Sequence, residues 1–266
     1  MPRVRKYLVL ASQTLQGTMA YRVQYLVNLL SGLVQALVLY YIWQAVYQGR
    51  VSLNGYTLAD MVTYIFVSYA VKNLYSFYTE TRISSSVRDG SVAMDLIRPM
   101  NYQLARFAES VGSVVVEGVL IGVLVALVGG ALFGMRPPAG VVAGCAFGAS
   151  VVLSMLVNFS LCYAVGLVSF WTTTVYGIVN SKRFIVDFLS GGLVPLAFFP
   201  GWLGSIARVL PFESIVHVPV SIYLGRISGA AIVSALLRQA AWAVVLWVAG
   251  VLVWMQARKR ITIHGG

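Results

Sequence analysis

The chain has 266 residues, of which 59% are apolar and only 10% are charged, and its mean hydropathy is +0.82. A soluble domain with so few charges would lack the polar surface needed to cover its exterior, so the composition excludes a soluble enzyme, a disordered protein and a disulfide-stabilised secreted protein. The net charge of +11 comes from small groups of Lys and Arg between long apolar runs. Such a pattern is typical of loops that face anionic lipid, and it argues against a nucleic-acid partner.

Residues 1–22 are predicted to form an amphipathic helix that lies in the membrane interface. Arg5 falls off the apolar face of this helix, so its charge would meet lipid headgroups. The alternative is a plain cytoplasmic extension of the first spanning helix. The apolar positions that recur at helical spacing are Val4, Leu8, Ala11, Leu15 and Met19.

Six segments are apolar enough to cross a bilayer, which takes about 20 mostly apolar residues. The fifth is short and contains Pro195, which favours a broken or re-entrant helix. The expected fold is therefore all-α, with residues 1–266 forming a single polytopic membrane domain. The predicted spans are Val23–Tyr47, Leu58–Tyr78, Val111–Gly134, Gly140–Phe170, Phe184–Phe199 and Ala230–Ala257.

Polar side chains along the first predicted span share one helical face, because they follow the spacing i, i+4, i+7 and i+11. Polar groups are costly against lipid, so this face is expected to meet another helix, another subunit or an aqueous pathway. Both hydrogen bonding between helices and the lining of a translocation pathway fit the pattern. The residues are Gln24, Asn28, Ser31 and Gln35.

Three charged residues fall inside predicted spans near their cytoplasmic ends. A pair of Lys72 with Glu117 or Asp187 would neutralise charges that are otherwise costly in lipid. Lys72 could instead extend its ammonium group to the interface. We expect a structural ion pair rather than a proton relay, since a relay needs titratable groups across the whole bilayer.

The longest predicted cytoplasmic loop, Thr79–Ser110, contains a short helical stretch. Gly90 supplies a break, Ser91 is a plausible N-cap, and Pro99 ends the helical pattern, so a helix is expected over Val92–Ile97. Its apolar residues have little to pack on within a loop. The helix is therefore expected to dock on another molecule, the alternative being that it lies on its own bundle or on the membrane.

The fourth predicted span carries Gly140, Gly144 and Gly148, whose four-residue spacing favours close packing of helix backbones. Further on, residues 200–229 are cut by prolines and are more apolar than an aqueous loop. Short helices that dip into the outer leaflet are expected there. These prolines are Pro200, Pro211 and Pro219.

The distribution of Lys and Arg sets the expected orientation, since cytoplasmic loops are enriched in both. Most of them fall on one side if the N-terminus is cytoplasmic, including the Arg258–Arg260 cluster of the tail. Both termini are then cytoplasmic, and the chain is expected in the inner (plasma) membrane.

Three segments carry a resemblance to a known family. In order and placement they resemble the permease subunit of type-2 ABC exporters. That family has an interfacial N-terminal helix, six spans, a coupling helix between spans two and three, and short re-entrant helices before the last span. The segments are Val87-Arg88-Asp89-Gly90, Asp95-Leu96-Ile97-Arg98-Pro99, and Phe199-Pro200 with Leu210-Pro211-Phe212 and Pro219.

The resemblance implies a non-catalytic transport subunit that works with separate ATPases. The sequence lacks a G-x-x-x-x-G-K-[ST] phosphate loop, so ATP and Mg would be bound by two copies of a partner ATPase, and this chain itself would need no cofactor or metal. A second permease, identical or related, would complete the membrane part. The residues implied in coupling are Arg88, Asp89, Gly90, Asp95, Leu96, Arg98 and Pro99.

Two other functions were weighed against this one. An ion-coupled secondary transporter would be expected to show an internal repeat, and the two halves contain no convincing one. An intramembrane enzyme acting on lipid needs a nucleophile or metal constellation, and His217 stands alone in the predicted outer segment. No pattern in the sequence indicates the substrate.

Overall fold

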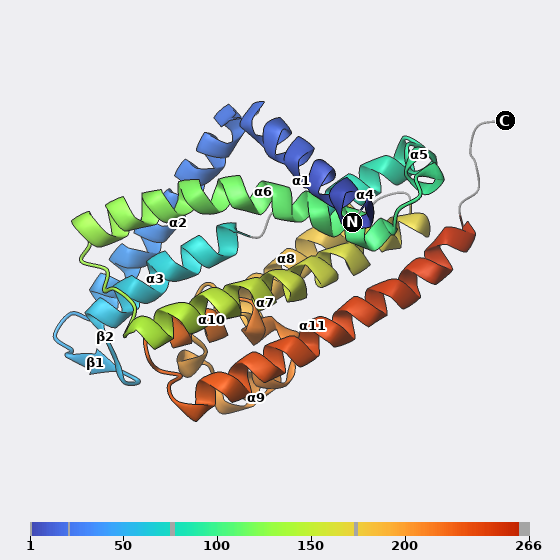
Figure 1. The fold of residues 1–266 in the computed structure, drawn as a ribbon. Coiled ribbons are helices and arrows are strands. Elements are labelled where there is room, and N and C mark those ends of the chain that lie inside the picture. Colours follow the sequence, from blue (N-terminus) through green and yellow to red (C-terminus); the bar gives the residue numbers. More distant parts are fainter. Residues whose placement is uncertain (1, 21, 75–77, 173–174, 261–266) are drawn as a thin grey trace.

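The computed structural model describes residues 2–20, 22–74, 78–172 and 175–260, which form an elongated helical bundle (Figure 1). The α-helices are α1 Pro2–Ala20, α2 Arg22–Val46, α3 Leu58–Asn73, α4 Tyr78–Arg88, α5 Val92–Ile97, α6 Tyr102–Val125, α7 Val141–Leu167, α8 Tyr176–Leu189, α9 Gly201–Val209, α10 His217–Tyr223 and α11 Ala230–Ala257. The shorter turns are π-helical η1 Ala126–Leu132 and the 3₁₀ segments η2 Val168–Phe170, η3 Leu196–Phe198, η4 Pro211–Ser214 and η5 Arg258–Arg260.

Three of the described helical stretches are long and apolar enough to cross a membrane. They are Tyr102–Leu132, Val141–Phe170 and Ala230–Arg260, and Leu30–Val46 within α2 is a shorter apolar helix. α6, α7 and α11, which make up most of the three stretches, run alongside one another through the length of the bundle (Figure 1). The structure thus confirms an all-α, polytopic membrane protein.

Helix α3 lies at the centre of the bundle and is buried on nearly all sides. A capping box starts it: the Thr57 hydroxyl accepts a hydrogen bond from the Asp60 amide at 3.2 Å, and the Asp60 carboxylate accepts one from the Thr57 amide at 3.0 Å. Its side chains pack against α2, α6 and α10. Because its buried residues include the polar Thr63 and Ser68, α3 is packed against protein rather than exposed to lipid.

The stretch predicted as a loop over Thr79–Ser110 is largely helical. It contains α4, α5 and the first turns of α6, which begins at Tyr102 rather than at the expected Val111. The earlier start has a local cause, because the Asn101 side chain accepts a hydrogen bond from the Leu104 amide at 3.0 Å and caps the helix.

A short hairpin of β1 Ser52–Leu53 and β2 Tyr56–Thr57, which the sequence did not predict, joins α2 to α3.

The segment predicted as a fifth span over Phe184–Phe199 begins and ends earlier as a helix. α8 starts at Tyr176 and stops at Leu189, after which Gly191 takes a positive φ of 79° and the chain turns. Beyond it, Pro200 precedes α9 and Pro211 opens η4, as expected of helix-starting prolines. Pro219 differs, since it lies within α10 instead of separating two pieces.

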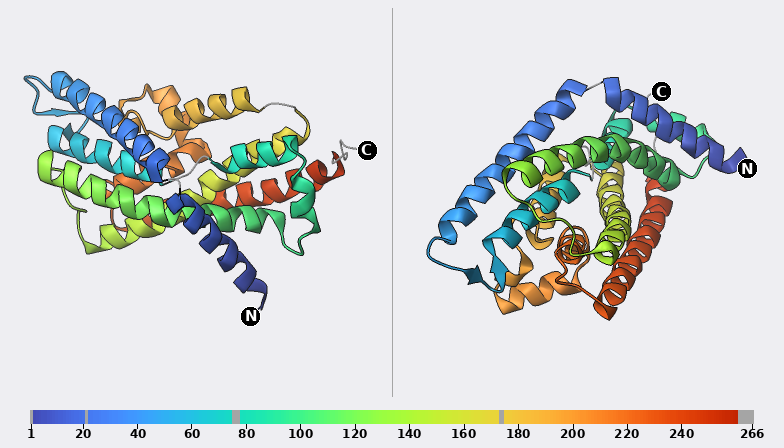
Figure 2. Two further views of the ribbon diagram at one scale, coloured as in Figure 1. Left: turned by 90° about the horizontal axis from the view of Figure 1, so that it is seen from above. Right: turned by 60° about the vertical axis from the view of Figure 1, so that its left-hand side comes forward.

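Close backbone approach occurs at isolated glycines and not at the predicted stripe on α7. A Cβ atom built at Gly140 or Gly148 would meet no atom within 4 Å. At Gly112 of α6, in contrast, a Cβ would overlap the carbonyl oxygen of Ala11. Gly112 is therefore the point at which α1 rests on α6, and Figure 2 shows α1 leaving the bundle at an angle from that contact.

Replacing Gly112 with alanine is expected to push α1 away from α6, because the added methyl group overlaps backbone that has no flexible side chain to give way. Faster amide hydrogen exchange in α1 would report the displacement. Gly122→Ala on the same helix is the control, since a Cβ there meets nothing within 4 Å and alanine favours helix by about 1 kcal/mol. Unchanged α1 exchange in Gly112→Ala would contradict the close approach.

Candidate functional site

The corner between α4 and α5 lies at one end of the bundle, beside the N-terminal end of α1 and the C-terminal end of α11 (Figure 1). Gly90 turns the chain there with a φ of 75°. The Asp89 carboxylate accepts hydrogen bonds from the Ser91 hydroxyl at 2.7 Å and from the Ser91 amide at 3.0 Å, and these bonds hold the pKa of Asp89 below its usual range. Ser91 is thus engaged by Asp89 and does not cap α5, contrary to the prediction.

Helix α5 divides its apolar side chains between the bundle and the exterior. Val92 is buried in a cluster with Ile83 and Tyr102. Met94, Leu96 and Ile97 are 64%, 40% and 78% exposed. The helix therefore packs on its own bundle through one apolar residue while it presents these three outward, and an exposed apolar surface is typical of a docking site.

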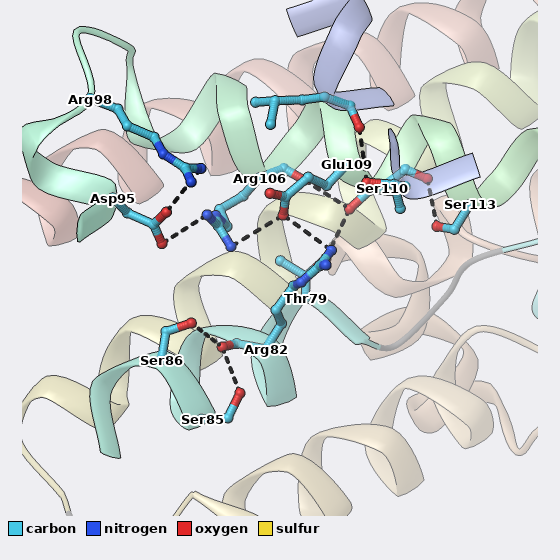
Figure 3. Close-up of polar contacts among 12 residues, drawn as sticks. Thr79, Arg82, Ser85, Ser86, Asp95, Arg98, Arg106, Glu109, Ser110 and Ser113 are labelled. Atoms are coloured by element: carbon cyan, nitrogen blue, oxygen red, sulfur yellow. Dashed lines mark hydrogen bonds and ion pairs between the residues drawn. The ribbon is translucent and has the colours of Figure 1, made fainter. Parts of the chain in front are cut away.

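A chain of five alternating charges links α5 to α6 and α4 (Figure 3). Arg106 Nη2 lies 2.9 Å from Asp95 Oδ2, and Arg106 Nη1 lies 3.1 Å from Glu109 Oε2. Exposed arginines close both ends of the chain, with Arg98 3.5 Å from Asp95 and Arg82 3.3 Å from Glu109. The Arg106 side chain is only 6% exposed, so the charges at the centre are largely withdrawn from water.

Sequence reasoning named Asp95 and Arg98 but missed the residues that anchor them. Arg106 and Glu109 are three residues apart, a spacing that brings side chains together only on a helix. The signal for that helix is Asn101, which lies within the stretch predicted as a loop. Recognising Asn101 as an N-cap would have placed both side chains on one face.

The segment after α5 is also held by α1. Arg98 adopts an extended backbone before Pro99, as residues that precede proline do. Lys6 Nζ donates a hydrogen bond to the carbonyl oxygen of Pro99, and the Asn101 amide donates one to the Tyr7 hydroxyl at 3.1 Å. Three elements, α1, α4 and α6, therefore fix the position of α5.

The polar face predicted on the first span points away from the rest of the chain where it is described. Ser31 and Gln35 of α2 are exposed, with exposed Val27 and Val34 near them. Ser31 donates a hydrogen bond to the carbonyl of Val27 in its own helix. The side chains of Gln24 and Asn28 lie outside the described residues. Packing against another helix of this same chain therefore does not account for Ser31 and Gln35.

The structure brings together two of the three charges that the sequence predicts within spans. Lys72 Nζ of α3 lies 3.0 Å from Asp187 Oδ1 of α8, and both side chains are mostly buried. The side chain of Glu117 lies outside the described residues. This contact joins the central helix to α8, so the charges are compensated within one chain.

Two further buried polar clusters were not anticipated. Glu80 of α4 is fully buried, with Lys182 Nζ of α8 2.8 Å from its Oε1 atom and Lys182 Nζ also 3.1 Å from Cys162 Sγ. On α11, the Gln239 amide donates to the Ser214 carbonyl at 2.7 Å and to the Ser154 hydroxyl at 3.0 Å. Both clusters hold together helices that are distant in sequence.

Within the described ranges, no three His, Cys, Asp or Glu side chains gather closely enough to hold a metal ion. Comparison with known proteins gives one family match: the model of the ABC-2 family transporter protein matches residues 33–265. No curated protein matches the chain. The match covers the α4–α5 corner, the ion chain and every helix from α3 to α11.

Proposed function

Since the chain belongs to the ABC-2 family of transporter proteins, we propose that it is the membrane-spanning permease subunit of an ATP-driven exporter. Permeases of this family work with ABC ATPase partners. The α4–α5 corner is the proposed docking site of such an ATPase, and the family resemblance stated from the sequence is confirmed by the match over residues 33–265.

The observation that carries this proposal is the exposed apolar surface of α5, together with the ion pairs that attach α5 to α6. An element that transmits force from a partner needs a surface for that partner to grip and firm attachment to the spans. Leu96 and Ile97 supply the first, and the Asp95–Arg106–Glu109 ion chain supplies the second. Arg88 and Asp89 are exposed at the edge of the same surface.

We further propose six spans, formed by α2, α3, α6 with η1, α7, α8 with η3, and α11. The N-terminal end of α1, the α4–α5 corner and the C-terminal end of α11 share one end of the bundle (Figure 1). The excess of Lys and Arg at this end of the bundle favours its location in the cytoplasm. Both termini then lie on the cytoplasmic side of the plasma membrane. The short helices α9 and α10 then belong to the outer side, as re-entrant pieces.

A second permease, identical or related, completes the proposed pathway. Ser31 and Gln35 support this step because they are exposed on α2, and polar groups facing lipid are costly. A partner chain or an aqueous pathway along that face would remove the cost. Two ATPase copies would bind such a pair, one at each α4–α5 corner, and would carry the ATP and Mg.

The coupling assignment is tested by a variant carrying Asp89→Ala, Leu96→Asp and Arg98→Ala, co-expressed with ABC ATPases from neighbouring genes. Co-purification of the ATPase is expected to fall about tenfold or more, because a charge replaces a central apolar contact. Permease-stimulated ATP hydrolysis should fall with it. Val209→Asp is the control, since Val209 is 72% exposed on α9, away from the corner.

Full retention of the ATPase by the triple variant would show that the corner is not the docking site. Transport by the unmodified chain without any ATPase, and its collapse with an ion gradient, would favour the ion-coupled alternative instead.

A further inference from the structure

An open groove of about 660 Å³ separates α1 from the segment that follows α5. Three cations line it: Arg5 and Lys6 near the start of α1, and Arg98 at the end of α5. Among the described residues, no carboxylate forms an ion pair with Arg5 or Lys6, and the ion-pair partner of Arg98 is Asp95 at 3.5 Å. The groove therefore carries a net positive charge.

The same groove has an apolar side. Val9, Leu10 and Met100 line it, and Val9 is 46% exposed. Leu8, on the same helix, is 64% exposed. A site for a free anion would gain nothing from these side chains, whereas a ligand with a charged head and an apolar body would contact both surfaces.

We propose that this groove binds an anionic phospholipid of the cytoplasmic leaflet, with its phosphate against Arg5, Lys6 and Arg98 and its acyl chains beside Val9 and Leu10. The inference rests on the proposed orientation, which places this end of the bundle at the cytoplasmic face. Charge complementarity selects an anionic headgroup over a zwitterionic one, because each basic residue near an anionic lipid contributes separately to binding.

A lipid in this groove would act on the segment that carries α5. Lys6 donates a hydrogen bond to the Pro99 carbonyl, and Tyr7 accepts one from the Asn101 amide. The lipid would add a bridge between the same two elements through Arg5 and Arg98. The position of α5 would then depend on the anionic lipid content of the membrane.

Native mass spectrometry of the purified chain in neutral detergent, titrated with dioleoylphosphatidylglycerol, tests the proposal. No ATPase is present, so failure of the proposed docking would leave this measurement unaffected. The variant Arg5→Gln, Lys6→Gln, Arg98→Gln is expected to weaken the first binding event by about a hundredfold, from roughly fivefold for each of the three cations. The double variant Arg5→Gln, Lys6→Gln keeps the Arg98–Asp95 pair and should show an intermediate loss.

The matched control is Arg258→Gln, Lys259→Gln, Arg260→Gln, which removes three exposed cations from the same end of the bundle but outside the groove. It should bind phosphatidylglycerol as the unmodified chain does. Equal losses in both triple variants would overturn the site in favour of general surface charge, and tight binding of dioleoylphosphatidylcholine would overturn the headgroup selection. Displacement by millimolar inorganic phosphate would identify a free-anion site, and an undiminished affinity in the groove triple would overturn the proposed lipid site.

Discussion

Replacing Arg106 with glutamine is expected to destabilise the bundle end and to release α5. Arg106 is 6% exposed and lies between two carboxylates, those of Asp95 at 2.9 Å and Glu109 at 3.1 Å. Glutamine would leave both carboxylates facing one another, with only the exposed arginines at the outer ends as counter-charges. Removing one partner from a buried ion pair typically costs about 3–5 kcal/mol, and we expect the lower end of that range here.

Two measurements distinguish the release of α5 from a loss of stability in the whole bundle. Thermal unfolding in detergent should shift downward by several degrees. Amide hydrogen exchange should rise most in Val92–Ile97, because α5 is attached to α6 through Asp95. An unfolding temperature and α5 exchange equal to those of the unmodified chain would show that the ion chain does not hold the helix.

Arg98→Gln is the matched control for Arg106→Gln. Arg98 contacts the same Asp95, but its side chain is 55% exposed and the distance is 3.5 Å, so its loss should cost no more than about 1 kcal/mol. Combining Arg106→Gln with Asp95→Asn and Glu109→Gln should recover much of the lost stability, since the three inner groups are then neutral and the two remaining arginines are exposed. ATPase binding should follow α5 order across those variants that keep Arg98.

The short helix α5 could be predicted from sequence because its signals are local. Gly90 before it and Pro99 after it mark its ends, and the structure places the helix over Val92–Ile97 as expected. The sequence does not predict α4 because only three of its residues, Tyr78, Ile83 and Val87, are apolar. It is stabilised by tertiary burial of Ile83 and Glu80, which no local pattern reveals.

Packing glycines could not be identified by spacing alone. The stripe at Gly140, Gly144 and Gly148 matches a known motif, yet α7 packs closely on α4 at the isolated Gly166, where a Cβ would lie 3.0 Å from Glu80 Cα. Likewise, Gln239 gives no sign in the sequence that it anchors α11. Its partner Ser154 is 85 residues away, and such contacts follow from the three-dimensional arrangement of the spans.

Replacing Lys182 with methionine is expected to have the second large effect, because it leaves the Glu80 carboxylate buried without its counter-charge. Glu80 is fully buried, Lys182 is 9% exposed, and their charged atoms are 2.8 Å apart. Within the described structure, Glu80 Oε2 already has no hydrogen-bond partner, so the carboxylate has little else to stabilise it. A cost of about 3–5 kcal/mol follows from removing one partner of a buried pair.

The double variant Glu80→Gln, Lys182→Met distinguishes the pair from its surroundings. It should be more stable than Lys182→Met, because neutral groups of similar size carry no unpaired charge into the interior. Asn180→Met is the control for helix α8, since Asn180 is exposed on the same helix. Thermal unfolding of the unmodified chain, Glu80→Gln, Lys182→Met and the double variant gives the coupling energy of the pair. If the stability losses of the two single variants add, Glu80 and Lys182 are stabilised separately. The position of α4 against α7 and α8 would then depend on the packing at Ile83 and Gly166.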